Sequence, residues 1–314
     1  MQLKTANQSI IQKIAPFIGL ILIILIISIL EPRFLATSNL LNVLRQVSMN
    51  ALIAFGMTFV ILTGGIDLSV GSILALTGAV TAGMMASGMD PILAMLIGLL
   101  LGAVLGAING IIIAKGKVAP FIATLATMTI YRGLTLVYTE GRPISGLGDN
   151  MAFQMLGKGY FLGIPIPVVT MLISFAILYF ILKKTTFGRR VFAVGGNEEA
   201  SILSGINAYR VKIYVYALVG LLAGLASLIL TSRLNSAQPT AGEMFELDAI
   251  AAVVLGGTSL TGGRGWIVGT LIGALIIGVL NNGLNLIGVS SFFQQVVKGA
   301  VILLAVLLDR KKTA

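Results

Sequence analysis

Long stretches without a charged residue alternate with short charged segments along almost the whole chain. The uncharged stretches cover residues 14–30, 46–66, 68–89, 91–114, 118–131, 159–182, 213–232, 249–263 and 265–297. A helix needs about 20 apolar residues to cross a bilayer, and it satisfies its own backbone hydrogen bonds there. The last stretch is too long for one span, and residues 288–291 provide a turn inside it. The pattern predicts an all-α polytopic membrane protein with about ten transmembrane helices, in which residues 1–314 form one domain.

The composition excludes a soluble globular domain, for which about a quarter of the residues are usually charged. Here 57% of the residues are hydrophobic, 10% are charged and the mean hydropathy is +1.03. If both termini are cytoplasmic, most of the 21 Lys and Arg residues fall in cytoplasmic segments, as the positive-inside rule expects. The net charge of +10 therefore reflects membrane orientation, and we expect no nucleic-acid partner.

Cysteine and histidine are both absent from the chain. Zinc sites, thiol chemistry and imidazole acid–base catalysis are therefore excluded. We expect neither a catalytic residue nor a metal ligand.

The most charged segment, residues 183–212, lies between two uncharged stretches and reads KKTTFGRRVFAVGGNEEASILSGINAYRVK. Asn197 is a good N-cap, Glu198 and Glu199 suit the positive start of a helix, and Gly205 suits its end. A helix this short is unstable alone. We predict a cytoplasmic loop whose short helix is held against the protein and presents Ile202 and Leu203 to a partner. The alternative is an ordinary solvated loop.

Glycines recur at helical spacing in two places, at residues 98, 102, 106 and 110 and at residues 265, 269 and 273. Small residues at this spacing let membrane helices approach closely, and we expect tight helix packing at both. Residues 64–71 also align with residues 256–263 as G-G-x-x-L-[ST]-x-G, which indicates two weakly related halves. Paired glycine-interrupted segments are typical of the translocation path of transporters.

One acidic residue and one cluster of asparagines near the predicted spans are the candidates for a substrate pathway. Asp67 and Ser69 follow a Gly-Gly pair, so Asp67 either lines a pathway at a helix interruption or simply caps a helix start near the cytoplasmic end. Asn281 and Asn285 share a helical face beside Asn282, and amides suit sugar hydroxyls because they both donate and accept. The alternative for the asparagines is hydrogen bonding between helices. Arg132 and Lys298 are interpreted as snorkelling or paired residues.

Several segments resemble the permease subunits of bacterial sugar ABC importers of the ribose/xylose/galactoside group. They are VILTGGIDLSVGSILALTGAV, GRRVFAVGGNEEASILSGI, NSAQPTAG and ELDAIAAVVLGGTSLTGGRG, and the resemblance runs from about residue 34 to residue 311. It implies a type II-like permease of the bacterial inner membrane that passes ribose or a similar monosaccharide by alternating access. It also implies a pore of two permease copies surrounded by membrane lipid.

The same resemblance implies two further partners: a separate ATP-binding subunit and a periplasmic sugar-binding protein. Residues 195–205, including Gly195 and Gly196, would form the coupling helix that contacts the ATPase. The chain lacks the motif G-x-x-x-x-G-K-[ST], so it has no phosphate-binding loop of this type. We therefore expect no cofactor on this chain, with ATP and Mg on the partner. Residues 139–164 and 232–245 are predicted to be the periplasmic loops on which the binding protein docks.

Two other functions fit parts of the sequence. A permease of a branched-chain amino-acid ABC importer would share the architecture. An ion-coupled secondary transporter would need an acid or a histidine deep in a span, a role that only Asp67 could fill.

Overall fold

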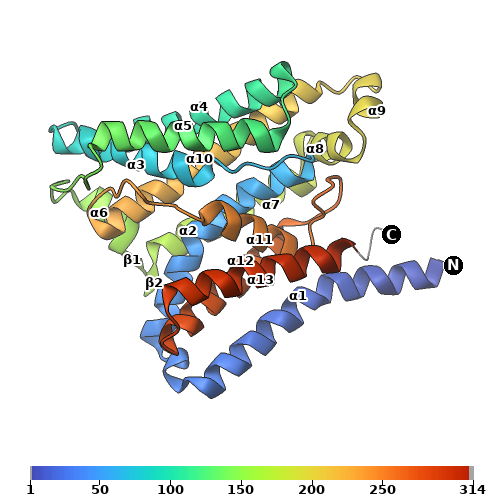
Figure 1. Cartoon of the computed structure of the whole chain (residues 1–314), viewed down its shortest axis with the longest axis horizontal. Coiled ribbons are helices and arrows are strands. Elements are labelled where there is room, and N and C mark those ends of the chain that lie inside the picture. The colour runs from blue at the N-terminus through green and yellow to red at the C-terminus, as the bar shows by residue number, and fades with distance from the viewer. Residues whose placement is uncertain (1, 311–314) are drawn as a thin grey trace.

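The structure is a computed structural model that describes residues 2–310. It is built almost entirely of helices (Figure 1). In chain order the helical elements are α1 (Gln2–Leu30), η1 (Pro32–Leu35), α2 (Thr37–Leu62), α3 (Val70–Ala86), α4 (Pro91–Gly116), α5 (Pro120–Thr139), α6 (Met151–Lys158), α7 (Ile166–Lys184), α8 (Thr186–Gly196), α9 (Glu198–Leu203), α10 (Ala208–Leu234), α11 (Phe245–Leu255), α12 (Ile267–Leu286) and α13 (Ser291–Arg310). Strands β1 (Tyr160–Phe161) and β2 (Ile164–Pro165) form an antiparallel hairpin between α6 and α7.

Helices α2, α4, α5, α7, α10 and α12 are long and apolar enough to cross a membrane. Shorter apolar helices cover Ile14–Leu30 and Val70–Ala86. The chain is therefore a multi-pass membrane protein, and the predicted all-α polytopic fold is confirmed. Figure 1 shows that α8, α9, the start of α1 and the end of α13 lie at one end of the molecule, here called the α9 end. Helix α6 and the β-hairpin lie at the opposite end.

Helix α2 occupies the centre of the bundle, and its residues 51–62 are buried without exception. It packs against α7, α10, α11 and α12. In Figure 1, α3, α4, α5 and α10 lie on one side of it and α1 and α13 on the other. Helices with apolar residues all round are expected in such a position.

The first predicted glycine stripe packs α4 against α10 and α3. Gly102 faces the carbonyl of Gly220, Gly106 faces that of Tyr216, and Gly110 faces the backbone of Ile213. A methyl group at Gly102 would lie 2.6 Å from the Gly220 oxygen, so this close packing requires glycine. In the second stripe, Gly269 and Gly273 pack α12 against α11, whereas Gly265 precedes α12 and packs on Thr258.

Two of the predicted crossings are only partly helical. Helix α3 has 17 residues, about 25 Å, and α11 has 11 residues, about 16 Å, against a hydrocarbon core of about 30 Å. We call them the half-helices. Residues 63–69 run from the end of α2 back toward the middle of the molecule, where α3 begins, and residues 235–244 do the same before α11 (Figure 1).

The starts of the half-helices meet at Gly71 and Gly242, whose backbones are in contact. Arg132 of α5 fixes the segment before α11, because its Nη1 donates to the carbonyls of Pro239 and Ala241. The segment at residues 232–245, predicted to be a periplasmic loop, therefore contacts the bundle at Pro239, Ala241 and Gly242, while Thr240 is exposed. Its assignment to the periplasmic side stays a prediction.

Other boundaries also differ from the prediction. Residues 139–164 contain α6 and the hairpin, and residues 183–212 contain α8 in addition to the short helix. The turn predicted at residues 288–291 is present, with Gly288 at φ 81° between α12 and α13. Lys311 and Lys312, expected on the cytoplasmic side, lie outside the described residues.

Candidate functional site

The short helix predicted within residues 183–212 is present as α9. The Asn197 side chain accepts a hydrogen bond from Ala200 N at 2.8 Å, Glu198 and Glu199 occupy the first turn, and Gly205 follows with φ 84°. That φ favours glycine, so both predicted ends are confirmed. Leu203 is 89% exposed and Ile202 is 47% exposed. The helix therefore presents two apolar side chains to whatever lies beyond the α9 end.

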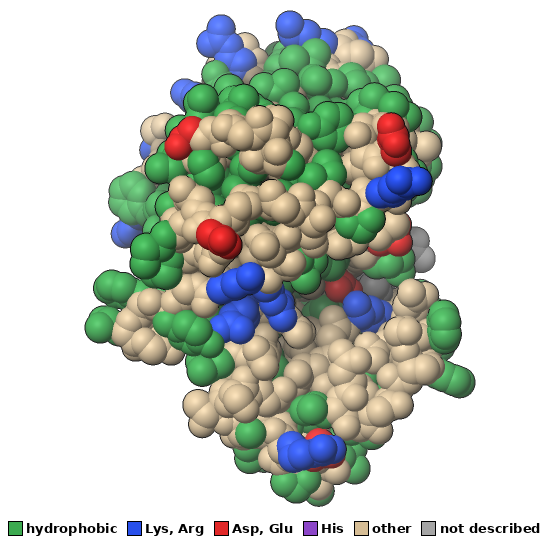
Figure 2. Space-filling view, turned by 90° about the vertical axis from the view of Figure 1, so that its left-hand side faces the viewer, with side chains coloured by type: hydrophobic (Ala, Val, Ile, Leu, Met, Phe, Trp, Pro, Cys, Tyr) green, Lys and Arg blue, Asp and Glu red, His purple; other side chains and the backbone are tan. Residues whose placement is uncertain are grey.

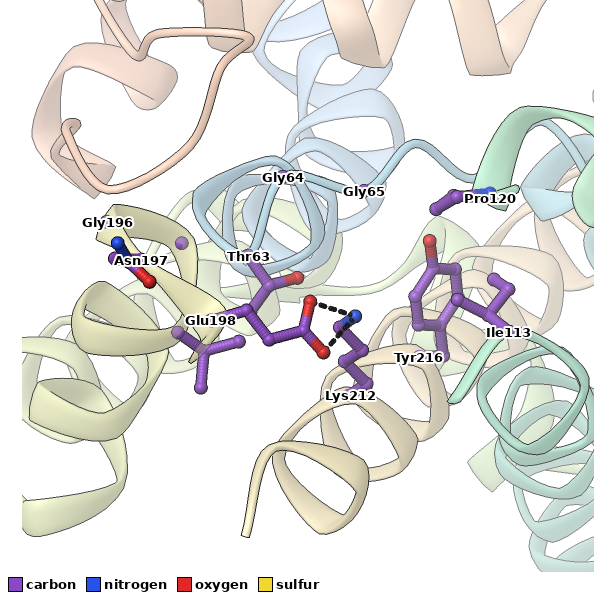
Figure 3. A pocket seen from close by; sticks show the side chains of 12 residues that line it. Thr63, Gly64, Gly65, Ile113, Pro120, Gly196, Asn197, Glu198, Lys212 and Tyr216 are labelled. Carbon is purple, nitrogen blue, oxygen red and sulfur yellow. Dashed lines mark hydrogen bonds and ion pairs between the residues drawn. The ribbon is translucent and has the colours of Figure 1, made fainter. Parts of the chain in front are cut away.

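An ion pair fixes α9 to the membrane helices. Lys212 Nζ of α10 lies 2.7 Å from both Oε1 and Oε2 of Glu198, and the two side chains point toward each other in Figure 3. Ser201 is buried on the inner face of α9. A helix of 6 residues is unstable alone, so these contacts to the body hold its orientation.

Helix α8 was missed by the sequence analysis. Thr185 is its N-cap, accepting from Gly188 N at 3.3 Å. Phe187, Val191 and Val194 follow at i, i+4 and i+7, the spacing of a helical face. Val191 and Val194 are buried, and the ring of Phe187 stacks on Phe59 at 6.4 Å. This apolar stripe could have predicted the helix. The lysines and arginines around it instead led to the interpretation of the segment as a charged loop.

A cavity of about 380 Å³ lies beneath the turn between α8 and α9 (Figure 3). The predicted residues Gly195, Gly196, Asn197 and Glu198 form one wall of it. The lining is completed by Thr63 to Gly65, Ile113, Pro120, Val194, Lys212 and Tyr216.

Asp67 lies in the extended segment before α3 and is 0% exposed. Its Oδ1 accepts from Ser69 N at 2.8 Å and from Ser69 Oγ at 2.7 Å, and Ser69 Oγ in turn accepts from Asn109 Nδ2. Oδ2 of Asp67 is buried and has no hydrogen-bond partner within the part of the chain that the structure describes. The interpretation of Asp67 as the N-cap of a helix is wrong: Ser69 occupies the cap position of α3, and the Asp67 carboxylate closes a turn ahead of it.

The three asparagines of α12 occupy different environments. Asn282 and Asn39 of α2 exchange two hydrogen bonds of 3.0 Å, and Asn285 accepts from Gln294 of α13 at 2.9 Å. Asn281 Oδ1 is buried without a partner. Two of the three therefore bond to other helices. Among the described residues, no hydrogen bond joins them to the network around Asp67.

A second polar cluster inside the bundle was not predicted. Lys298 Nζ of α13 lies 3.1 Å from Asp248 Oδ2 of α11, and Asn50 Nδ2 of α2 approaches the same oxygen at 3.4 Å. Asp248 is 4% exposed. The available signal was that a basic residue within a predicted span requires a partner. Sequence spacing does not identify that partner, because the contact depends on how α11 and α13 pack. Among the described residues, no group of three or more acidic side chains could hold a metal ion.

Comparison with known proteins adds to this geometry. Residues 39–306 match the family model described as branched-chain amino acid transport system / permease component. The chain is 70% identical over 305 residues to the ribose import permease protein of Bacillus subtilis strain 168, covering 97% of this chain and 95% of that protein. It is 57% identical over 297 residues to the ribose import permease protein of Escherichia coli strain K12, covering 94% and 92%.

A more distant similarity is to the D-allose transport system permease protein of Escherichia coli strain K12. The two are 44% identical over 300 residues, covering 95% of this chain and 91% of that protein. No solved structure matches the chain.

Proposed function

The chain belongs to the family of permease components described for branched-chain amino acid transport systems, and we propose that it is the permease of an ATP-driven importer of ribose. The observation that carries this proposal is the near full-length identity to two ribose import permease proteins, which exceeds the identity to the D-allose permease. The helical membrane architecture and the absence of a phosphate-binding motif support a transport subunit that does no covalent chemistry itself.

The energy would come from a separate ATP-binding subunit that docks at the α9 end, with ATP and Mg bound to that partner. The exposed side chains of Ile202 and Leu203 suit an apolar contact, and the ion pair between Glu198 and Lys212 would hold that contact against α10. In this proposal Gly195 to Glu199, Ile202, Leu203 and Gly205 are the coupling residues. The α9 end and both termini would then be cytoplasmic, and the membrane would be the bacterial inner membrane.

A sugar-binding protein would dock on the opposite end, which Figure 2 shows as two lobes separated by a hollow with basic side chains along its wall. Arg45 Nη2 donates to Tyr160 of the hairpin at 2.6 Å, and Arg233 lies within reach of the charge of Arg45. Within residues 2–310 neither arginine forms an ion pair. Two like charges that form no ion pair among the described residues suit an acidic partner surface, whose pairing would set orientation and encounter rate.

We propose that two copies of the chain form the pore and that polar groups of each bundle become the lining of the sugar's path when the bundle opens. The candidates remain Asp67, Ser69, Asn281, Asn282 and Asn285, to which Asp248, Lys298 and Asn50 are added. Amides and charged groups can bond the hydroxyls of a sugar. The half-helices support this placement, because interrupted helices line the binding sites of many transporters.

Uptake by the reconstituted complex tests the proposal. The chain is placed in liposomes with its ATPase and binding protein, and uptake of ribose, D-allose, xylose and leucine is compared with ATP and without it. We expect ATP-dependent uptake of ribose. Preferential uptake of leucine would identify an amino-acid importer, and ribose uptake driven by an ion gradient alone would identify a secondary transporter.

A further inference from the structure

Three backbone segments meet directly behind α9. They are Leu62 to Gly64 at the end of α2, Gly195 and Gly196 at the end of α8, and Gly262 and Gly263 in the loop between α11 and α12. We propose that this glycine junction carries the displacement of α9 to both half-helices, with Gly195 as the residue that positions it. The inference rests on the proposed function and names the residues through which the ATPase would act.

Contacts between backbone atoms form the junction. Gly263 N donates to Leu62 O at 3.0 Å. A methyl group on Gly195 would overlap that same Leu62 oxygen and would lie 2.7 Å from Gly263 N. One on Gly262 would lie 2.9 Å from both Gly195 O and Gly64 N. Gly195 therefore touches the other two segments at once, and only a residue without a side chain fits there.

Backbone contact determines how a displacement is transmitted. Packed side chains can take up small movements by changing rotamer, whereas backbone segments in direct contact must move together or separate. Asn197, which caps α9, is two residues from Gly195. A force on the exposed side of α9 therefore reaches Leu62 and Gly263 without passing through a flexible side chain.

Each partner of Gly195 leads to one half-helix. Leu62 is the last residue of α2 and is joined to α3 by the extended residues 63–69, while Gly262 follows the C-terminal end of α11 at Leu255. The half-helices meet again at their starts, where a methyl group on Gly242 would lie 2.7 Å from Gly71 O. A path of backbone contacts thus runs from the coupling helix to the centre of the bundle by two routes.

The two segments joined here are also the two copies of the sequence repeat, residues 64–71 and 256–263. Gly64 is the first residue of one copy in the G-G-x-x-L-[ST]-x-G alignment, Gly262 is the seventh residue of the other, and the two lie against each other. The repeat therefore places one glycine-rich turn from each half at the junction with the end of α8, directly before α9, so that both halves receive the same displacement.

The test replaces Gly195 with alanine in the complete complex with ATPase and binding protein. We expect Gly195→Ala to lower ribose uptake per ATP hydrolysed by at least about tenfold, while ATP hydrolysis stays within about twofold of the parent, since coupling between sites is typically worth 5–150-fold. Gly133→Ala in α5 is the matched control, because a methyl group there meets nothing within 4 Å. It should change neither quantity.

A second readout separates transmission from general damage. The chain has no cysteine, so Thr240→Cys, exposed in the segment before α11, can be labelled alone with a water-soluble maleimide. Its labelling rate should differ between the nucleotide-free and ATP-bound complexes in the parent and in the Gly133→Ala chain. It should not differ in the Gly195→Ala chain.

Each outcome decides between the proposals. If the parent complex does not take up ribose with ATP, the proposed function fails; if it does and Gly195→Ala remains fully coupled, the junction proposal is overturned. Should Gly195→Ala not assemble, hydrogen exchange at the Gly263 amide of the parent complex provides the answer. The junction requires that amide to stay protected in both nucleotide states, and loss of protection in either state would overturn it.

Discussion

Lys298 of α13 and Asp248 of α11 form an ion pair, with 3.1 Å between Nζ and Oδ2. The two residues are 50 positions apart in the sequence. The Asp248 side chain is 5% exposed and that of Lys298 is 20% exposed, so water screens the pair only weakly. The pair therefore ties the half-helix α11 to the last helix of the bundle.

Replacing one partner of this pair should destabilise the protein more than replacing both partners. Lys298→Met leaves Asp248 buried with only Asn50 beside it, which we expect to cost about 3 kcal/mol of unfolding free energy. The double variant Lys298→Met with Asp248→Asn leaves no unpaired charge and should recover at least half of that loss. Thermal unfolding in detergent measures both, and a double variant as unstable as the single one would contradict the role of the pair.

Reversing the charge of Glu198 should uncouple the importer. Glu198→Lys faces Lys212 across the former ion pair, so α9 should lose its hold on α10, and ribose uptake should fall while ATP hydrolysis continues. Exchanging the two charges, with Glu198→Lys and Lys212→Glu together, should restore most of the uptake. If the exchange restores nothing, the pair does not act by holding α9.

Leu203 offers a test of the docking surface without disturbing the fold. Its side chain is 89% exposed, so Leu203→Asp should leave the thermal stability of the isolated chain unchanged within about 0.5 kcal/mol. It should weaken binding of the ATPase by at least about tenfold, as expected for an apolar residue at the centre of an interface. Titration of the purified chain with labelled ATPase measures this, and unchanged affinity would remove α9 from the interface.

We expect the hydrogen bonds of Asp67 to contribute to the stability of the protein. Asp67→Ala leaves the Ser69 amide without its acceptor in a buried position, at a cost of about 1–3 kcal/mol, and empties the space of a carboxylate. Asp67→Asn keeps an acceptor oxygen and the volume, so it should retain most of the stability. Thermal unfolding and ribose uptake of both variants are the measurements. An alanine variant as stable as the parent would show that the turn before α3 does not depend on this side chain.

The sequence predicted elements whose signal is local. Long uncharged stretches indicated the membrane helices, and the caps at Asn197 and Gly205 bounded α9. The half-helices could not be foreseen, because residues 63–69 carry a single charge, that of Asp67, and residues 256–263 carry none. Whether such a stretch is helical depends on the backbone contacts it finds, here those of Gly71 with Gly242 and of Gly263 with Leu62.

The candidate site divides in the same way. Residues 195–205 were identified from charge, caps and resemblance. Asp248 and Lys298 were not paired, because their contact depends on how α11 and α13 pack. Asn282 illustrates the same limit: its partner Asn39 is 243 positions away, and no spacing rule connects them.

The first glycine stripe, which packs α4 against α10, has a consequence for how binding at one end of the protein affects binding at the other. Helix α10 has 27 residues, about 40 Å, with Lys212 near one end and Arg233 near the other, and its close packing makes it move with α4 as one body. In the proposed importer a tilt of that body would displace both docking surfaces. The binding protein and the ATPase would then affect each other equally. If the sugar-loaded binding protein changes the affinity of the chain for the ATPase by some factor, the ATPase must change the affinity of the chain for the binding protein by the same factor.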